Sequence, residues 1–404
     1  MNPRNSRQDP RRSVDPRLKP ILFGAPYIGE EEIREVVDTL RSGWIGTGPK
    51  TNLFETAFAA YTGSQFALGT NSGTAALHLS LNALGIEPGS EVITTPLTFV
   101  ATANVIEHSG AVPVFVDVSP YDGNIDIDQA VGAINERTQA LLPVHYAGAL
   151  ADVPALTARV SGTPVVVDAA HAVEGRYPSG LSSAGHGAVC TAYSFYATKN
   201  LVTGEGGMVV TDDEELAARM RTRSLHGLDN DAWKRYSSVG YADYDVEAPG
   251  FKYNMTDIQA SLGLHQLERI ELCHRRRGAV WEIYNEGFAD LEGVTIPPVA
   301  CKAHQVERHS RHLYTLWLDW DLLGLDRAQV VVGLKDEGIG TGWHFKAVHT
   351  HRYYKERYGY KPGDFPNAEA ISSSTLSLPM SAALTEADAE RVVDSVLRIV
   401  HRYR

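Results

Sequence analysis

One lysine of this sequence is well placed for covalent chemistry. Lys199 lies in the stretch 194–200, which follows an apolar segment and precedes a glycine-rich turn at 204–207. A lysine held at the floor of a pocket binds its proton less tightly, and an unprotonated primary amine can form a Schiff base with a carbonyl compound. Because a single lysine is more often a solvated surface charge, this interpretation depends on the residues that accompany Lys199.

Two further segments could complete a binding site around that lysine. Residues 71–75 open a helix that Ser72 or Thr74 can cap, and the free N–H groups and dipole at such a helix start suit a phosphate. Asp168 ends the apolar run 165–167, and a carboxylate buried there is costly unless it is paired, for example with a pyridinium N–H. Each segment alone could be an ordinary helix cap. Their order along the chain, with the phosphate cradle first, then the acid and then the lysine, indicates one site.

The elements that must position these residues alternate between strand and helix patterns. Short apolar runs predict strands at 91–95, 112–116, 140–145, 164–168, 193–196 and 208–211. Helical spacing predicts helices at 33–40 (ending at Gly43), 72–84, 98–108, 127–135, and from 256 past 267. Beyond about residue 270 the order changes to a strand at 313–319 and helices at 327–337 and 386–400.

These patterns predict three parts of the chain. Residues 1–20 are rich in Pro and Arg, which predicts a disordered arm. Residues 21–270 read as a large α/β domain with a mostly parallel sheet flanked by helices, because the strands are apolar enough to be buried on both faces. Residues 271–404 read as a smaller α+β domain.

The motifs, taken together, resemble those of the DegT/DnrJ/EryC1/StrS family of sugar aminotransferases over nearly everything after the arm. The matching segments are 42–49, 72–78, 98–102, 168–172, 194–200, 204–207, 253–259 and 376–379. The resemblance implies fold type I of the transferases that depend on pyridoxal 5'-phosphate (PLP), with pyridoxamine 5'-phosphate (PMP) as the intermediate form. It also implies L-glutamate as donor, 2-oxoglutarate as its product and a nucleotide-linked keto-sugar as acceptor.

The resemblance assigns four residues to the reacting part of the cofactor. Lys199 would form the Schiff base and act as general base, and Asp168 would hold the pyridine nitrogen protonated. His171 would lie beside the ring hydroxyl, and Phe99 would stack on the ring face. We therefore expect these side chains to meet in one cavity.

The resemblance also assigns residues to the cofactor phosphate and to the substrate. The phosphate would be bound by Gly73, Thr74 and Ser194. Asn254 would reach the same phosphate from the neighbouring subunit, so that a homodimer would share two sites. The residues expected near the sugar nucleotide are Lys252, Tyr253, His344 and His349.

The composition limits the partners and the cellular compartment that we expect for this protein. The formal net charge is −12 although the first twenty residues carry six basic and two acidic side chains, so the body is acidic and unsuited to nucleic acid. The three cysteines, Cys190, Cys273 and Cys301, are far apart, which argues against disulfides and a zinc site. The sequence has no secretory signal and no apolar run that could span a bilayer. We therefore expect a cytoplasmic protein without a membrane partner.

Several alternatives to an aminotransferase start from the same sequence. A PMP-dependent sugar dehydratase of this family would have His in place of Lys199, and a non-catalytic regulator would not need the cofactor constellation. A phosphate loop at 46–51 is rejected because Pro49 stands where a Gly is required. A metal site at His344, His349 and His351 lacks a carboxylate or Cys partner.

The sequence leaves the sugar open. Amination at C4 of a 4-keto-6-deoxyhexose on thymidine or uridine diphosphate is favoured because that chemistry is frequent in the family, and a 3-keto sugar is the second choice. Both would use the same cofactor motifs.

Overall fold

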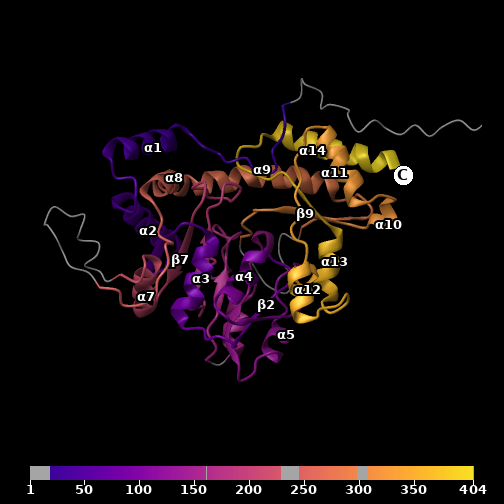
Figure 1. Ribbon diagram of the computed structural model, residues 1–404. Helices are drawn as coiled ribbons and strands as arrows, with labels where there is room; N and C mark the ends of the chain where they lie inside the picture. Colours follow the sequence, from indigo (N-terminus) through magenta and orange to yellow (C-terminus); the bar gives the residue numbers. More distant parts are fainter. Residues whose placement is uncertain (1–18, 161, 229–244, 298–307, 404) are drawn as a thin grey trace, which may run out of the picture.

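The central sheet of the protein is mostly parallel, as the sequence predicts. The computed structural model describes residues 19–160, 162–228, 245–297 and 308–403. In the larger part, seven strands form one layer (Figure 1): β1 (Phe66–Thr70), β2 (Glu91–Thr94), β3 (Val112–Phe115), β4 (Thr138–Leu142), β5 (Val166–Asp168), β6 (Cys190–Ser194) and β7 (Gly207–Thr211).

The strands run in the order β1-β7-β6-β5-β4-β2-β3. Ladders join β1-β7-β6-β5 and β3-β2-β4, and parallel bridges between Leu141 and Val165 and between Val144 and Asp168 connect the two groups. Strand β7 is antiparallel to β1 and β6, whereas the β5–β6, β2–β4 and β2–β3 pairs are parallel. The carboxyl ends of β4, β5 and β6 therefore meet at one edge, where open α/β sheets place their sites.

Both faces of this sheet are buried. Val165 and Val167 pack into one apolar cluster, and Val166 between them packs into another on the opposite face. Alternate side chains of a strand point to opposite faces, so a continuous apolar run is what a two-sided core requires. The helices of this part are α1 (Glu30–Ser42), α2 (Pro49–Thr62), α3 (Gly73–Leu84), α4 (Val100–His108), α5 (Ile127–Gly132), α6 (Val153–Arg159), α7 (Glu214–Ser224) and α8 (Asp257–Glu268), with a 3₁₀ turn at Tyr146–Gly148.

The smaller part is built on a three-stranded antiparallel sheet in the order β10-β9-β8. The long helix α9 runs from the larger part to this sheet and packs beside α14 (Figure 1). The elements are α9 (Ile270–Phe288), β8 (Val294–Thr295), β9 (Tyr314–Leu318), α10 (Trp320–Leu323), α11 (Arg327–Asp336), a 3₁₀ turn (Val348–Thr350), α12 (Arg352–Tyr358), α13 (Pro366–Ser374), β10 (Thr375–Leu378) and α14 (Glu386–Tyr403).

The boundary at residue 270 stays a prediction, because α9 belongs to both cores. Ile270 packs with the core of the large sheet, and Trp281 packs with the core of the small sheet. Ile21 also packs with the small sheet, where its backbone pairs with Ile339. Residues 1–18 of the predicted arm, and Cys301, lie outside the described residues.

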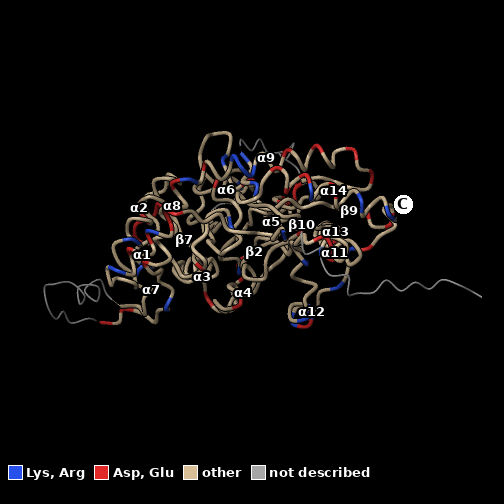
Figure 2. Tube along the Cα trace, turned by 90° about the horizontal axis from the view of Figure 1, so that it is seen from above, with Lys and Arg blue, Asp and Glu red and all other residues tan. Residues whose placement is uncertain are grey.

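The predicted first helix forms, but much of its apolar face is exposed. Helix α1 ends at Gly43, whose φ of 76° favours glycine. Ile33 and Leu40 are 49% and 54% exposed, whereas the residues just before them, Glu32 and Thr39, are buried. Helices α1 and α2 lie at the end of the molecule opposite α12 and α13 (Figures 1 and 2). None of the helices in the described ranges has the length and apolarity needed to cross a membrane.

Candidate active site

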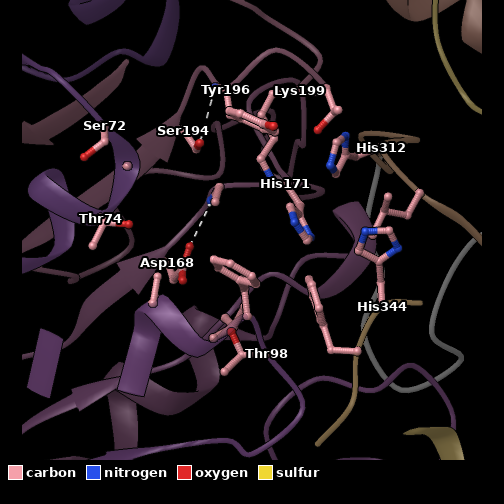
Figure 3. A pocket seen from close by; sticks show the side chains of 18 of the residues that line it. Ser72, Thr74, Thr98, Asp168, His171, Ser194, Tyr196, Lys199, His312 and His344 are labelled. Atoms are coloured by element: carbon pink, nitrogen blue, oxygen red, sulfur yellow. Dashed lines mark hydrogen bonds between the residues drawn. The ribbon is translucent and has the colours of Figure 1, made fainter. Parts of the chain in front are cut away.

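A cavity of about 390 Å³ lies over the edge of the sheet where β5 and β6 end. It is bordered by the first turn of α3, the segment that leads into α4, and the segments before β9 and around residue 344. Figure 3 shows Asp168, Lys199, His171 and Ser194 around this space. The predicted residues that line the cavity are Gly73, Thr74, Phe99, Asp168, His171, Ser194, Lys199 and His344.

The first turn of α3 forms one end of the cavity. Ser72 is the N-cap, and its side-chain oxygen accepts a hydrogen bond from the Ala75 N–H at 3.1 Å. The backbone at Gly73 lies so close to Ser194 that a Cβ on Gly73 would be 2.7 Å from the Ser194 Cβ. The first N–H groups of a helix have no partner within it, so this turn, with the Ser194 hydroxyl beside it, offers donors to an anion.

Asp168 lies at the end of β5 with its carboxylate in the cavity wall. It accepts hydrogen bonds from the Thr102 hydroxyl at 2.8 Å and from the Ala170 N–H at 3.1 Å. Burial raises the pKa of Asp168, while these two donors and the charge of Lys199 oppose the rise. A cationic N–H group in the cavity would offset the desolvation of this carboxylate.

Lys199 lies on the turn that follows β6, where its backbone N–H donates to the Tyr196 carbonyl at 2.8 Å. Burial lowers the pKa of its amine from 10.5 to about 8, and the nearby Asp168 carboxylate opposes this shift. A larger fraction of the amine is therefore unprotonated near neutral pH than for a solvated lysine. Such an amine can act as a nucleophile and as a base.

Three histidines border the lysine side of the cavity. His171 stacks on Phe345 with ring centroids 5.7 Å apart, and its ring lies 4.5 Å from that of His312. The His171 Nδ1 atom is buried and has no hydrogen-bond partner among the described residues. Burial lowers the pKa of His344 to about 4, and this ring is held by Ser377 at 2.8 Å. Neutral imidazoles in this position can hydrogen-bond to a bound molecule without adding charge.

Phe99 forms the more open side of the cavity. It precedes α4 as its N-cap residue, and its side chain is 59% exposed. Its ring lies 6.1 Å from that of Phe345 at a tilt of 46°. An exposed aromatic face at the mouth of a cavity is available to stack on a planar ligand.

Four predicted residues do not line this cavity. Asn254 donates to the Thr47 hydroxyl at 2.6 Å, and the Tyr253 hydroxyl bonds to His78 at 2.9 Å. The neighbouring Lys252 contributes its carbonyl to Asn71. His349, in contrast to the sequence expectation, is buried beneath the surface.

The position of His349 has a clear physical reason. Its Nε2 atom lies 3.1 Å from the Glu369 carboxylate, and its ring packs on Phe365 at 4.8 Å. Its side chain is 1% exposed, so in this chain it is a paired core histidine. No three His, Cys, Asp or Glu side chains in the described ranges are grouped so that they could hold a metal ion.

Sequence reasoning missed several residues of the site: Phe23, Thr102, Glu205, His312 and Phe345. Thr102 lies in the motif 98–102, and its hydroxyl is 2.7 Å from that of Thr98, which precedes α4. Glu205 lies in the glycine-rich motif 204–207. No local pattern marks Phe23, His312 or Phe345, because each reaches the cavity through a distant part of the chain.

Comparison with known proteins agrees with this geometry. The sequence profile of the DegT/DnrJ/EryC1/StrS aminotransferase family matches residues 26–397. The spore coat polysaccharide biosynthesis protein SpsC of Bacillus subtilis is 48% identical over 382 residues, which cover 94% of this chain and 96% of SpsC. The putative sugar aminotransferase Spr1654 from Streptococcus pneumoniae, in its PMP form, superposes with a TM-score of 0.86 at 34% identity, covering 95% of this chain and 98% of that one. DesI, solved in the presence of its TDP-sugar product, has a TM-score of 0.83 at 31% identity and coverages of 95% and 94%.

Proposed function

Because this chain belongs to the DegT/DnrJ/EryC1/StrS family of PLP-dependent sugar aminotransferases, we propose that it aminates a nucleotide-linked keto-sugar. The amino donor is L-glutamate, and the acceptor is a 4-keto-6-deoxyhexose on thymidine or uridine diphosphate, aminated at C4. The observation that carries the proposal is the convergence of Lys199, Asp168 and the first turn of α3 on one cavity. The TDP-sugar product of the similar protein DesI supports the choice of a nucleotide sugar.

The residues of the cavity fit PLP. The α3 turn and Ser194 offer N–H and hydroxyl donors to its phosphate, and the buried Asp168 carboxylate suits a protonated ring nitrogen. The unpartnered His171 Nδ1 offers a hydrogen bond to the ring hydroxyl. When bound, the cofactor supplies the electron sink that makes the Cα–H bond of the amino donor acidic.

The chain's own groups supply position and proton transfer. Lys199 would hold the cofactor when it is bound, and the Lys199 amine, once free, would accept the proton from the donor Cα. In the second half-reaction Lys199 delivers a proton to the sugar carbon. With a pKa of about 8, the amine can both accept and release a proton near neutral pH. One residue thus serves both halves, and ping-pong kinetics are expected.

We propose that the active unit is a homodimer with shared sites. Asn254 does not line the cavity of its own chain, and its side chain donates to the hydroxyl of Thr47. Exposed apolar side chains lie between α1 and α2 and on these two helices: Ile33, Leu40, Trp44, Ile45 and Leu53. Covering them with a second copy would bury apolar surface and would allow Asn254, Lys252 and Tyr253 to reach the partner's site.

We also propose a cytoplasmic location. The two cysteines in the described ranges, Cys190 and Cys273, are free and buried, which suits a reducing compartment. Both substrates are charged, soluble metabolites, so the reaction itself needs no membrane.

The deciding experiment is a panel of nucleotide 3-keto- and 4-keto-sugars incubated with the holoenzyme and glutamate, followed by NMR of the product. A 4-amino sugar formed together with 2-oxoglutarate supports the proposal. A 3-amino sugar would replace it with C3 amination. Loss of a hydroxyl without glutamate consumption would identify a dehydratase, and a purified protein without cofactor or turnover would identify a regulator.

A further inference from the structure

A chain of polar side chains connects the inner part of α9 with the cavity wall. Arg277 pairs with the Glu174 carboxylate, which also accepts a hydrogen bond from the Asn200 amide at 2.7 Å. The Asn200 side-chain oxygen lies 3.0 Å from Nδ1 of His312, and His312 lines the cavity. These residues come from four separate segments, and Asn200 directly follows Lys199 in the sequence.

The orientation of the Asn200 amide follows from its neighbours. Its Nδ2 group donates to the Glu174 carboxylate and to the Ser310 carbonyl at 2.9 Å. Both partners can only accept hydrogen bonds, so the amide oxygen must be the atom that faces His312. An oxygen can only accept here, and Nδ1 of His312 therefore carries the proton. A neutral imidazole has one ring proton, which leaves Nε2 as a hydrogen-bond acceptor.

The free acceptor of His312 belongs to the reaction cavity. None of the described residues forms a hydrogen bond with its Nε2 atom, and the ring lies beside His171 in the cavity wall (Figure 3). Burial and nearby positive charge lower the pKa of His312 well below its ordinary value. The titratable or charged groups around this ring are Lys199, His344, Arg277, His309 and His171. The imidazole consequently stays neutral at physiological pH.

The ion pair behind Asn200 is hard to explain by stability alone. Arg277 is 2% exposed and Glu174 is fully buried. The desolvation of two such charges commonly cancels their attraction, so apolar side chains of similar size would stabilise the fold as well or better. A pair that fixes the proton position on a cavity histidine has a role that apolar residues could not fill.

We propose that Glu174 and Asn200 are positioning residues for amino transfer: they fix His312 in the tautomer whose Nε2 accepts N–H hydrogen bonds inside the cavity. These N–H groups belong to the Lys199 amine and to the amine of the donor, which takes the place of Lys199 on the cofactor during the reaction. The inference rests on the proposed reaction with glutamate and is independent of which keto-sugar is the acceptor.

The tautomer can be measured directly in the wild-type holoenzyme. Protein labelled with ¹⁵N-histidine is examined by NMR, and a His312→Gln variant identifies the His312 signals. We expect a protonated Nδ1 and an unprotonated Nε2 from pH 6 to 8. A proton on Nε2 would overturn the proposal, and this test needs no variant at Asn200 to fold.

A second test changes the group that faces Nδ1. In Asn200→Asp the new carboxylate stabilises the imidazolium form of His312, so the ring gains a proton at higher pH and Nε2 no longer accepts. We expect the rate at which glutamate converts bound PLP to PMP to fall about ten- to a hundredfold at pH 7, as when a partner that fixes a functional imidazole is lost. We expect the acidic limb of the rate profile to move upward by roughly one pH unit or more.

Asn285→Asp is the matched control, because Asn285 accepts a hydrogen bond from the Tyr314 hydroxyl at 2.9 Å outside the cavity. We expect it to behave as wild type. An Asn200→Asp protein that binds PLP and keeps the wild-type rate and pH profile would overturn the positioning role. If wild-type protein itself does not react with glutamate, the proposed donor is wrong, and the NMR result still decides the tautomer of His312.

Discussion

Thr102 is one of the two hydrogen-bond donors that favour the charged form of Asp168, and replacing it with Val tests the electrostatics of the site. The Thr102 hydroxyl is buried and donates to the Asp168 carboxylate at 2.8 Å. Val keeps the shape of the side chain and removes the donor. Asp168 would then keep the Ala170 N–H as its other donor and would lie in a less polar wall.

The size of the effect follows from the type of bond that is lost. A hydrogen bond to a charged group contributes about 1.5–3 kcal/mol. Losing this bond therefore raises the pKa of Asp168 further above the level to which burial has already raised it. If this carboxylate charge is needed throughout the chemical step, the same energy slows the step by about ten- to a hundredfold.

The assay is the single-turnover reaction of the PLP-bound protein with glutamate, followed by the change of cofactor absorption. Thr94→Val is the matched control, because Thr94 is also buried and donates to the Leu142 carbonyl at 2.7 Å without contacting Asp168. We expect the control to react at close to the wild-type rate. A Thr102→Val protein that holds PLP and reacts within twofold of wild type would refute the reasoning.

Three further predictions follow from other parts of the structure. Gly73→Ala places a Cβ 2.7 Å from the Ser194 Cβ. We expect the Kd for PLP, measured by equilibrium dialysis, to rise about tenfold, which is the equivalent of one lost hydrogen bond. An unchanged Kd would contradict the assignment of this turn to the phosphate. The pKa of Lys199 is about 8 in the folded protein and 10.5 for an ordinary lysine, so between these values the unfolded chain binds more protons. The free energy of unfolding is therefore highest above pH 10.5 and falls as the pH is lowered to 8. Thermal unfolding of the cofactor-free protein between pH 7 and 10 should therefore show a gain with pH that Lys199→Ala lacks, and parallel curves would argue against the shift. Leu40→Asp puts a charge on the exposed face of α1, and we expect sedimentation to show monomers with low activity; an intact, active dimer would exclude this face as the interface.

Much of the fold could be predicted because its signals are local. The run Val165–Val167 is apolar on every residue, as is typical of a strand buried on both faces. Strand β5 begins within it, and Val166 packs in one cluster while Val165 and Val167 pack in the other. Ser72 caps α3 as expected from its place before an apolar helix pattern. The order of the strands could not be predicted in the same way. Strand β1 pairs with β7, although the two lie far apart in the sequence, at residues 66–70 and 207–211.

The site was predictable where a motif contains the functional atoms. Lys199, Asp168 and Gly73 each carry a local signal, and all three line the cavity. His312 carries none, since its role depends on Asn200, which lies 112 residues earlier in the chain. His349 shows the opposite case, because the spacing of histidines does not reveal that this one will be buried and paired with Glu369.

The central claim, that Lys199 holds the cofactor, is tested most directly by borohydride reduction of the purified holoenzyme followed by peptide mass spectrometry. The structure predicts that the reduced cofactor is attached to the peptide containing Lys199, and that Lys199→Ala protein acquires no such adduct and does not turn over. An adduct on a different lysine, or a Lys199→Ala protein that turns over at the wild-type rate, would contradict the account.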